Sequence, residues 1–312
     1  MKRGVKEYIS IALKGCAMGA ADVIPGVSGG TIAFISGIYE ELIYSIKSVD
    51  LEAIKLLFSL KFREFWNKIN GNFLLAVFCG VVTSVLSLAK LMSHLIENHP
   101  IMIWSFFFGL IIASAILVFK QIEKFNLLSA ISIVIGVVTA YFITVMSPTE
   151  TPTDWWFIML CGAIAICAMI LPGISGSFIL LLMGKYLYIL GALSSFEFVT
   201  ISLFVAGAAI GIVSFSHLLS WLLKNFHTAT VSLLTGFMVG SLNKVWPWKE
   251  VIETTLNSHG EAVPLVEKNL LPHNFEVING EPSLLPLAIV MAIVGFLTIY
   301  IIEKAGNNLR NS

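Results

Sequence analysis

Most of this chain consists of apolar blocks about as long as the hydrocarbon core of a bilayer is thick. A helix needs about 20 apolar residues to cross roughly 30 Å of hydrocarbon. Of the 312 residues, 57% are hydrophobic and 12% are charged, whereas soluble domains have about 45–50% and about 25%. The sequence therefore predicts an all-α, polytopic membrane protein. The apolar blocks lie near residues 5–22, 24–46, 72–96, 101–119, 126–146, 155–170, 172–192, 197–223, 228–243 and 284–303.

Two intervening stretches are too polar to span a membrane. Residues 47–70 carry five lysines or arginines among apolar side chains, a composition typical of an amphipathic helix or helix pair at a membrane surface. Residues 244–283 are rich in glutamate, lysine and proline. We expect this second stretch to be an extramembrane loop with some structure of its own.

A short motif occurs twice in the chain, with an offset of 147 residues. Residues 25–30 read PGVSGG, and residues 172–177 read PGISGS. Between 25–39 and 172–186, seven of fifteen positions are identical. After the 47–70 insertion the match continues at an offset of 127 residues, which aligns Gly80 with Gly207, Ser93 with Ser220, Asn98 with Asn225 and Gly109 with Gly236.

These matches indicate an internal duplication, because chance similarity between apolar segments aligns Leu and Ile rather than Pro, Gly, Ser and Asn. Residues 1–146 form the first repeat, which contains the 47–70 insertion. Residues 147–312 form the second repeat, which contains the 244–283 loop.

The order of segments predicts that the two repeats have opposite orientations. Each repeat begins with two apolar segments joined at a Pro-Gly-x-Ser-Gly break and continues with three transmembrane helices. The joined pair is either two crossings or a re-entrant helical hairpin, and both give an even number of crossings. Three more helices give each repeat an odd number of membrane crossings, so the second repeat is inverted. The glycines, serines and glutamates of residues 24–46 make a poor lipid-facing span, which favours re-entrance.

The distribution of positive charge predicts which side faces the cytoplasm. One side receives both termini, 47–70, 120–125 and 224–227, which together hold thirteen lysines or arginines. The other side holds three, all in the 244–283 loop. Because positive residues accumulate on the cytoplasmic side, we expect both termini in the cytoplasm and the protein in the cytoplasmic (inner) membrane.

The two breaks are the candidate functional site. Broken backbone at membrane depth is tolerated only where protein buries it or where it lines a polar cavity. Proline suits the first turn of a helix, and a helix N-terminus attracts anions through its free N–H groups and its dipole. Proline-kinked helices with glycines for tight packing are the alternative. The candidate phosphate ligands are Pro25, Gly26, Ser28, Gly29, Gly30 and Thr31 with Pro172, Gly173, Ser175, Gly176 and Ser177.

Charged residues at membrane depth are further candidates. Asp22 precedes the first break, and its counterpart in the second repeat is the neutral Met169; we expect a single ion-coupling carboxylate, with a helix-capping acid as the alternative. Glu40 and Glu41 are expected to end the first half-helix, where they oppose the helix dipole, in a coupling or an interfacial role.

Two lysines complete the candidate set. Lys14 precedes the first break, and Lys185 lies on the second half-helix. Each could neutralise a bound phosphate. Each could equally extend its ammonium to the membrane surface.

Several classes of function find no support in the sequence. It contains no phosphate-binding GxxxxGK[ST] loop, no HExxH motif, no paired carboxylates and no recognisable Ser/His/Asp set. The four cysteines lie inside apolar stretches without a CxxC pair, as buried hydrophobic residues do. A net charge of zero gives no indication of a nucleic-acid partner. We therefore expect no enzyme, no cofactor and no metal site.

The chain resembles a known family at residues 14–31 (KGCAMGAADVIPGVSGGT) and again at residues 171–177 (LPGISGS). It is similar to the bacterial and archaeal polyprenyl-phosphate transporters, which were long catalogued as a membrane domain of unknown function. The resemblance covers essentially the whole chain. It implies a flippase that returns undecaprenyl phosphate, the carrier lipid of cell-wall precursors, from the outer to the inner leaflet.

Such a lipid carries about −1.5 to −2 charges at neutral pH. Inward movement against a negative-inside potential costs about 2.3 kcal/mol per charge per 100 mV, so we expect coupling to H⁺ or Na⁺ through Asp22. The alternative function is an ion-coupled carrier or channel for a small anion, using the same half-helix site. A membrane enzyme acting on a lipid phosphate would require a nucleophile or metal cluster that the sequence does not offer.

Overall fold

The computed structural model describes residues 3–22, 28–122, 124–149, 151–256 and 262–310. Two candidate site residues, Pro25 and Gly26, lie outside the described residues. The elements in chain order are α1 (Val5–Asp22), α2 (Gly29–Ile35), α3 (Tyr39–Lys47), α4 (Leu51–Phe58), α5 (Phe62–Lys68), α6 (Gly71–Asn98), α7 (Pro100–Phe119), α8 (Leu127–Val145), α9 (Trp155–Ile170), α10 (Gly176–Leu182), α11 (Tyr186–Ser194), α12 (Phe198–Asn225), α13 (His227–Ser241), β1 (Lys249–Leu256), β2 (Ala262–Asn269), α14 (Pro272–Asn279) and α15 (Leu285–Arg310).

The molecule is a helical membrane protein, as predicted. Windows in α6, α7, α8 and α12 are long and apolar enough to cross a bilayer. Shorter apolar helices occur at Trp155–Ile170 and Leu285–Ile301. Along α8, many large apolar side chains are exposed, which a helix facing lipid requires and a water-soluble surface does not tolerate.

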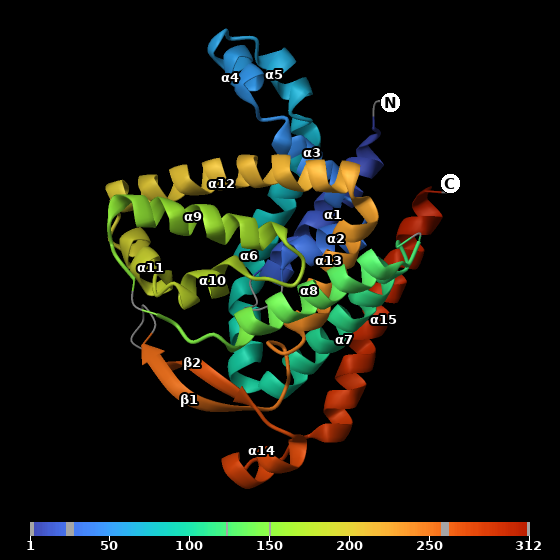
Figure 1. Ribbon diagram of the computed structural model, residues 1–312, viewed down its shortest axis with the longest axis vertical. Coiled ribbons are helices and arrows are strands. Elements are labelled where there is room, and N and C mark those ends of the chain that lie inside the picture. The colour runs from blue at the N-terminus through green and yellow to red at the C-terminus, as the bar shows by residue number, and fades with distance from the viewer. Residues whose placement is uncertain (1–2, 23–27, 123, 150, 257–261, 311–312) are drawn as a thin grey trace.

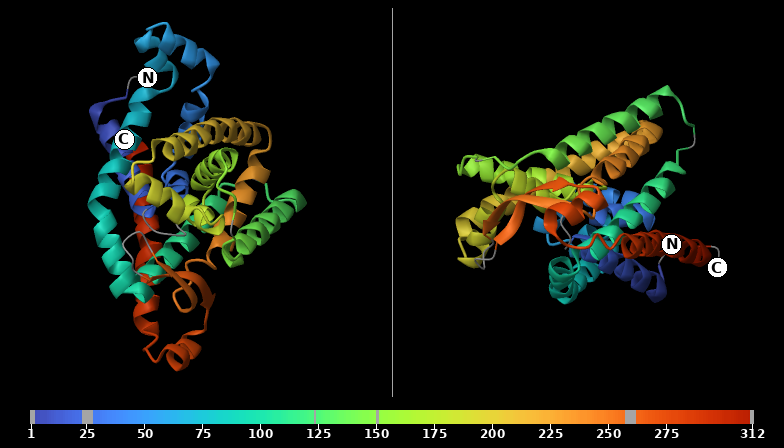
Figure 2. Two further views of the ribbon diagram at one scale, coloured as in Figure 1. Left: turned by 90° about the vertical axis from the view of Figure 1, so that its left-hand side faces the viewer. Right: turned by 90° about the horizontal axis from the view of Figure 1, so that it is seen from below.

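The two polar stretches lie at opposite ends of the molecule (Figure 1). Helices α4 and α5 project from the body at one end, near both chain termini, and Figure 2 shows them standing apart from the other helices. At the other end, β1 and β2 form an antiparallel hairpin in which Lys249 pairs with Asn269 and Leu256 pairs with Ala262. Residues 47–70 therefore contain a helix pair, and residues 244–283 contain a hairpin and helix α14.

The short helices after the two breaks end in the same turn. Gly37 and Gly184 adopt positive φ angles of 72° and 62°, which glycine adopts without strain. After α2, the N–H of Ile38 donates to the carbonyl of Ala33; after α10, the N–H of Lys185 donates to the carbonyl of Leu180. This is the Schellman pattern of helix termination. The following helix then turns away, and α10 and α11 meet at 108°.

Matched glycines allow the long helices to pack closely. Helix α1 packs on α6, and α9 packs on α12. A Cβ on Gly80 would lie 2.1 Å from the carbonyl oxygen of Ala12, and one on Gly207 would lie 1.9 Å from that of Met159. Ala12 and Met159 are themselves separated by the 147-residue offset, so the same backbone contact occurs once in each half.

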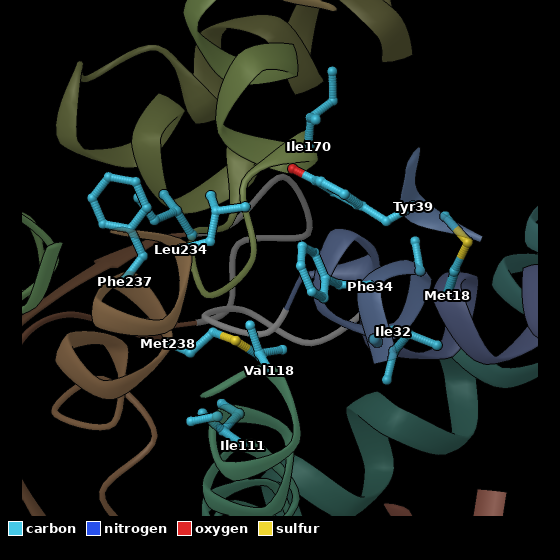
Figure 3. Close-up of a cluster of buried hydrophobic side chains, with 14 of the residues drawn as sticks. Met18, Ile32, Phe34, Tyr39, Ile111, Val118, Ile170, Leu234, Phe237 and Met238 are labelled. Carbon is cyan, nitrogen blue, oxygen red and sulfur yellow. The ribbon is translucent and has the colours of Figure 1, made fainter. Parts of the chain in front are cut away.

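The later helices of the two halves pack against each other: α7 packs on α15, and α8 packs on α13. Gly109 approaches Ala292 of α15, while its counterpart Gly236 approaches Ile133 of α8. The centre between these pairs is a buried apolar cluster drawn from both halves (Figure 3). Its labelled members include Phe34 and Tyr39 from the first half and Ile170, Leu234 and Met238 from the second.

Candidate functional site

The first break places polar groups around the N-terminus of α2. Ser28 caps the helix, and its Oγ accepts a hydrogen bond of 3.1 Å from the N–H of Gly30. The N–H of Gly29 donates to Asp22 Oδ1 at 2.6 Å. A Cβ on Gly29 would lie 2.4 Å from Asp22 Oδ2. Only glycine therefore lets the carboxylate approach this helix end so closely.

The two breaks meet inside the protein. Ser28 Oγ donates to the carbonyl oxygen of Met169 at 2.8 Å. The N–H of Gly173 donates to Thr31 Oγ1 at 3.0 Å. A Cβ on Gly30 would lie 2.4 Å from the carbonyl oxygen of Ile170. We call this meeting point the junction; it joins residues more than 140 positions apart.

The second break contributes two further hydroxyls. Gly173 has a φ of 89°, a left-handed conformation that favours glycine. Ser175 occupies the N-cap position of α10 but makes no side-chain capping bond. Instead its Oγ lies 2.8 Å from Ser177 Oγ. Pro172 and Gly176 are buried beside them.

The junction is closed in this conformation. Ser28 and Thr31 are each 1% exposed, and Ser175 is 5% exposed. The sequence predicts uncovered amides, but the amides of Gly29, Gly30 and Gly173 already donate to a carboxylate and two hydroxyls. Buried N–H groups require such partners. A headgroup that bound here would have to replace them.

The two candidate lysines lie away from the N-termini of the short helices. Lys185 is not on the second half-helix, as predicted, because α10 ends at Leu182 and Lys185 is the N-cap of α11. Lys14 Nζ donates to the carbonyl of Ser36 at 2.7 Å, and this carbonyl belongs to the C-cap of α2. Lys185 Nζ donates to the carbonyl of Thr151 at 2.7 Å. Cations are favourable at helix C-termini. Lys14 therefore contacts a helix end, and Lys185 contacts a loop carbonyl and the rings of Phe157 and Tyr188, rather than the junction.

The prediction that Glu40 and Glu41 end a half-helix is wrong. Because α2 stops at Ile35, both acids fall in the first turn of α3, where the helix dipole favours negative charge. Glu41 accepts hydrogen bonds of 2.5 and 2.7 Å from Arg3. Glu40 lies 3.4 Å from His227.

A cationic cluster near the β hairpin was not among the sequence candidates. Lys244 and Lys249 approach one carboxylate oxygen of Glu267 at 3.0 and 3.1 Å. Burial lowers the pKa of Lys249 to about 8. Burial alone would raise the pKa of Glu267, but the two lysines outweigh it and hold that pKa below its usual range. The signal that could have identified the cluster is that the side poor in positive charge concentrates its three lysines here.

No metal site is evident among the residues that the structure describes, because no three His, Cys, Asp or Glu side chains are grouped to hold one. The chemistry that the junction offers is hydrogen bonding by hydroxyls and amides beside one carboxylate.

Comparison with known proteins identifies relatives along most of the chain. A family profile described as undecaprenyl phosphate translocase-like matches residues 18–263. A polyprenyl-phosphate transporter of Vibrio cholerae is 48% identical over 298 residues, covering 96% of this chain and 97% of the relative. A polyprenyl-phosphate transporter of Staphylococcus aureus is 34% identical over 259 residues, covering 77% of this chain and 87% of the relative. No solved structure matches the chain.

Proposed function

Because this chain belongs to the undecaprenyl phosphate translocase-like family, we propose that it carries a polyprenyl phosphate from the outer to the inner leaflet of the cytoplasmic membrane. It is a transporter rather than an enzyme, as the names of its relatives indicate. In this proposal the phosphate headgroup passes through the junction, and the isoprenoid tail stays in lipid. Undecaprenyl phosphate is the expected substrate, and recycling of this carrier lipid is the expected role.

The observation that carries the proposal is the direct contact between the two breaks. Ser28 reaches the carbonyl of Met169, and Thr31 accepts from Gly173. Discontinuous helices that meet near the midplane are the usual substrate sites of transporters built from inverted repeats. The junction thus brings hydroxyl and amide groups together in an otherwise apolar interior, and these are the groups that can bind phosphate oxygens.

The packing supports two repeats of opposite orientation. The backbone contact made by Gly80 is repeated at Gly207, and the contact made by Gly109 is repeated at Gly236. The bend of 108° between α10 and α11 suits a re-entrant hairpin better than a straight span. An odd number of crossings in each repeat then gives inversion.

The positions of the polar segments support cytoplasmic termini. The chain ends lie at the same end of the molecule as α4 and α5, and the β hairpin lies at the opposite end (Figure 1). In the topology predicted from the sequence, thirteen lysines or arginines fall on the side of the termini and three on the side of the hairpin. The positive-inside rule therefore assigns the side of the termini to the cytoplasm.

Asp22 has the central role in the proposed mechanism. Its carboxylate accepts a hydrogen bond from the N–H of Gly29. A phosphate oxygen would use the same kind of donor. A phosphate entering beside an ionised Asp22 would place two like charges in contact, which is unfavourable in a low-dielectric interior. Binding H⁺ or Na⁺ at Asp22 removes that repulsion and releases the amide to the headgroup. The ion and the lipid would therefore move together.

The decisive experiment is a leaflet-accessibility assay in vesicles that contain the purified full-length protein and a fluorescent polyprenyl phosphate. Ser28→Ala removes the bond to Met169 and the acceptor for Gly30, and we expect lipid transfer to fall at least tenfold. Ser114→Ala is the matched control, because Ser114 is equally buried but bonds only within its own helix, to Leu110.

The same vesicle assay distinguishes the proposed function from the alternative function. A carrier or channel for a small anion would move inorganic phosphate and leave the leaflet distribution of the lipid unchanged. That result, or equal lipid transfer by Ser28→Ala and Ser114→Ala, would count against the proposal.

A further inference from the structure

A polar cavity of about 360 Å³ lies between α8, α10 and the β hairpin. Its lining includes Tyr141 from α8, Phe178 from α10, and Lys244, Lys249 and Glu267 from the segment that contains the hairpin. The β hairpin, which contributes to the lining of this cavity, lies on the side of the molecule opposite to both termini (Figure 1). In the proposed orientation it faces the extracytoplasmic leaflet.

The cavity has an excess of positive charge. Lys244 and Lys249 share the single oxygen Oε2 of Glu267, and Lys268 also lines the cavity. The Lys249 and Glu267 side chains are only 7% and 18% exposed. Each ammonium has three N–H donors, and in the described part of the chain those of Lys244 and Lys249 bond only to this carboxylate oxygen, which leaves most of the donors available. Partly buried positive charge without a matching anion is unfavourable.

Aromatic rings and amides hold the lysines in place. Lys244 Nζ lies 4.6 Å from the centre of the Phe178 ring, and Lys249 Nζ lies 4.3 Å from that of Trp104. Such cation–π contacts position an ammonium without neutralising its charge. Asn243 donates to Thr144 Oγ1 at 2.8 Å and thereby ties this segment to the end of α8. The two ammonium groups are thus placed by the shared carboxylate and by the aromatic rings.

The cavity adjoins the junction. Phe178 lies three residues after Ser175, on the same short helix. Lys244 lies three residues after Ser241, and a Cβ on Gly173 would be 2.9 Å from Ser241 Oγ. The N–H of Lys244 donates to the carbonyl of Ser241 at 2.9 Å, so Ser241 links the lysine segment to the second break.

We propose that this cavity is a receiving site, at which a phosphate monoester binds to Lys244 and Lys249 before it enters the junction. Phosphate binds point charges such as lysine ammonium groups through short, charge-assisted hydrogen bonds. The phosphate belongs either to a lipid of the outer leaflet or to free phosphate. Its role as an entry site rests on the proposed transport function, whereas the binding itself does not.

The test measures binding and transport on the full-length protein in lipid nanodiscs and vesicles. Polyprenyl phosphate in one arm and inorganic phosphate in the other are titrated against the wild type, Lys244→Gln and Lys249→Gln. Loss of one charged hydrogen bond should weaken binding about tenfold or more. Lys244→Arg keeps the charge and should restore most of the affinity, which a purely structural defect would not allow. Lys55→Gln, an exposed position on α4, is the charge-matched control.

The transport kinetics distinguish this site from the junction. In Lys244→Gln the lipid concentration for half-maximal transfer should rise while the maximal rate changes little; in Ser28→Ala the maximal rate should fall. Tighter binding of the lipid than of inorganic phosphate assigns the site to the lipid headgroup, and the reverse order would overturn the entry role.

Two results separate the failure of this inference from that of the proposed function. If the wild type transfers lipid and Lys244→Gln binds and transfers it equally well, the cavity is not a receiving site. If binding depends on Lys244 but the wild type transfers no lipid, the site stands and the transport function fails.

Discussion

Asp22 Oδ1 accepts a hydrogen bond of 2.6 Å from the backbone N–H of Gly29, the first residue of α2. The protein thus supplies its own anion at the helix N-terminus where a phosphate oxygen would bind. The counterpart of Asp22 in the second half is Met169, which contributes only its backbone carbonyl. One half of the junction therefore carries a titratable group, and the other half carries a fixed acceptor.

Asp22→Asn should uncouple transport from the ion gradient. The asparagine side-chain oxygen can still accept from Gly29, so the fold should persist, but the amide cannot bind a proton or compensate a Na⁺ ion. We expect the dependence of lipid transfer on a pH or Na⁺ gradient to disappear and the gradient-driven rate to fall at least tenfold. Transfer is measured in vesicles with and without each gradient.

Glu40→Gln is the matched control for that experiment. Glu40 is an exposed acid at the start of α3, so its neutralisation should leave the gradient dependence intact. Gradient-driven transfer that is the same in Asp22→Asn as in the wild type would exclude Asp22 as the coupling group.

Thr31→Val should destabilise the protein through the second contact of the junction. Valine has nearly the same shape as threonine but cannot accept the hydrogen bond from Gly173. A buried N–H left without a partner costs about 1–3 kcal/mol. In Thr235→Val, the control, the lost bond runs to Val231 of the same helix. Thermal unfolding in detergent should show a larger loss for Thr31→Val, and equal losses would mean that the contact between the breaks contributes nothing special.

Helix positions were largely predictable from the sequence. The bounds of α6, α7, α8 and α12 agree with the apolar blocks to within two residues, because the thickness of the bilayer sets their length. The motif repeat located both breaks. The positions of these helices and of the two breaks follow from the composition of local stretches of the chain.

The contacts of the junction were not predictable from the sequence. That Ser28 reaches Met169 depends on how segments 141 residues apart pack. The bond from Gly29 to Asp22 is local and corresponds to the capping acid that the sequence offered as the alternative. The error at Glu40 and Glu41 has a local cause, since Gly37 ends α2 one turn before them. From the sequence, the lysines of the cavity are only charged residues of an extramembrane loop. Nothing in the sequence indicates that two of them share one carboxylate.

Gly80→Ala and Gly207→Ala should each separate a tightly packed helix pair. The added Cβ would lie 2.1 or 1.9 Å from a backbone carbonyl oxygen, so the helices must move apart. We expect a lower melting temperature for both variants. The two decreases should be similar because the two contacts are equivalent. Gly191→Ala is the control: its Cβ would meet nothing within 4 Å, and alanine favours a helix over glycine by roughly 0.5–1 kcal/mol. A stability of Gly80→Ala equal to that of Gly191→Ala would contradict close packing.

Glu267→Gln should lower the pKa of Lys249 below its value in the wild type. Burial depresses that pKa from 10.5 to about 8, while the charge of Glu267 raises it in part. Between these two values the unfolded chain holds one proton more than the folded chain, so raising the pH through this window stabilises the hairpin. Without the charge of Glu267, the pKa of Lys249 in the folded protein falls further, so Lys249 loses its proton at a lower pH.

The titration is followed by NMR of ¹³C-dimethylated lysines, with the Lys249 resonance assigned by Lys249→Arg. The other titratable groups that line the cavity, Tyr141, Lys244 and Lys268, remain in both proteins. Because a neutral amine attracts phosphate less than an ammonium, phosphate binding at pH 7.5 should weaken in Glu267→Gln even though a negative charge has been removed. Stronger binding with an unchanged Lys249 titration would show that Glu267 only repels the phosphate and does not sustain the charge of its neighbour.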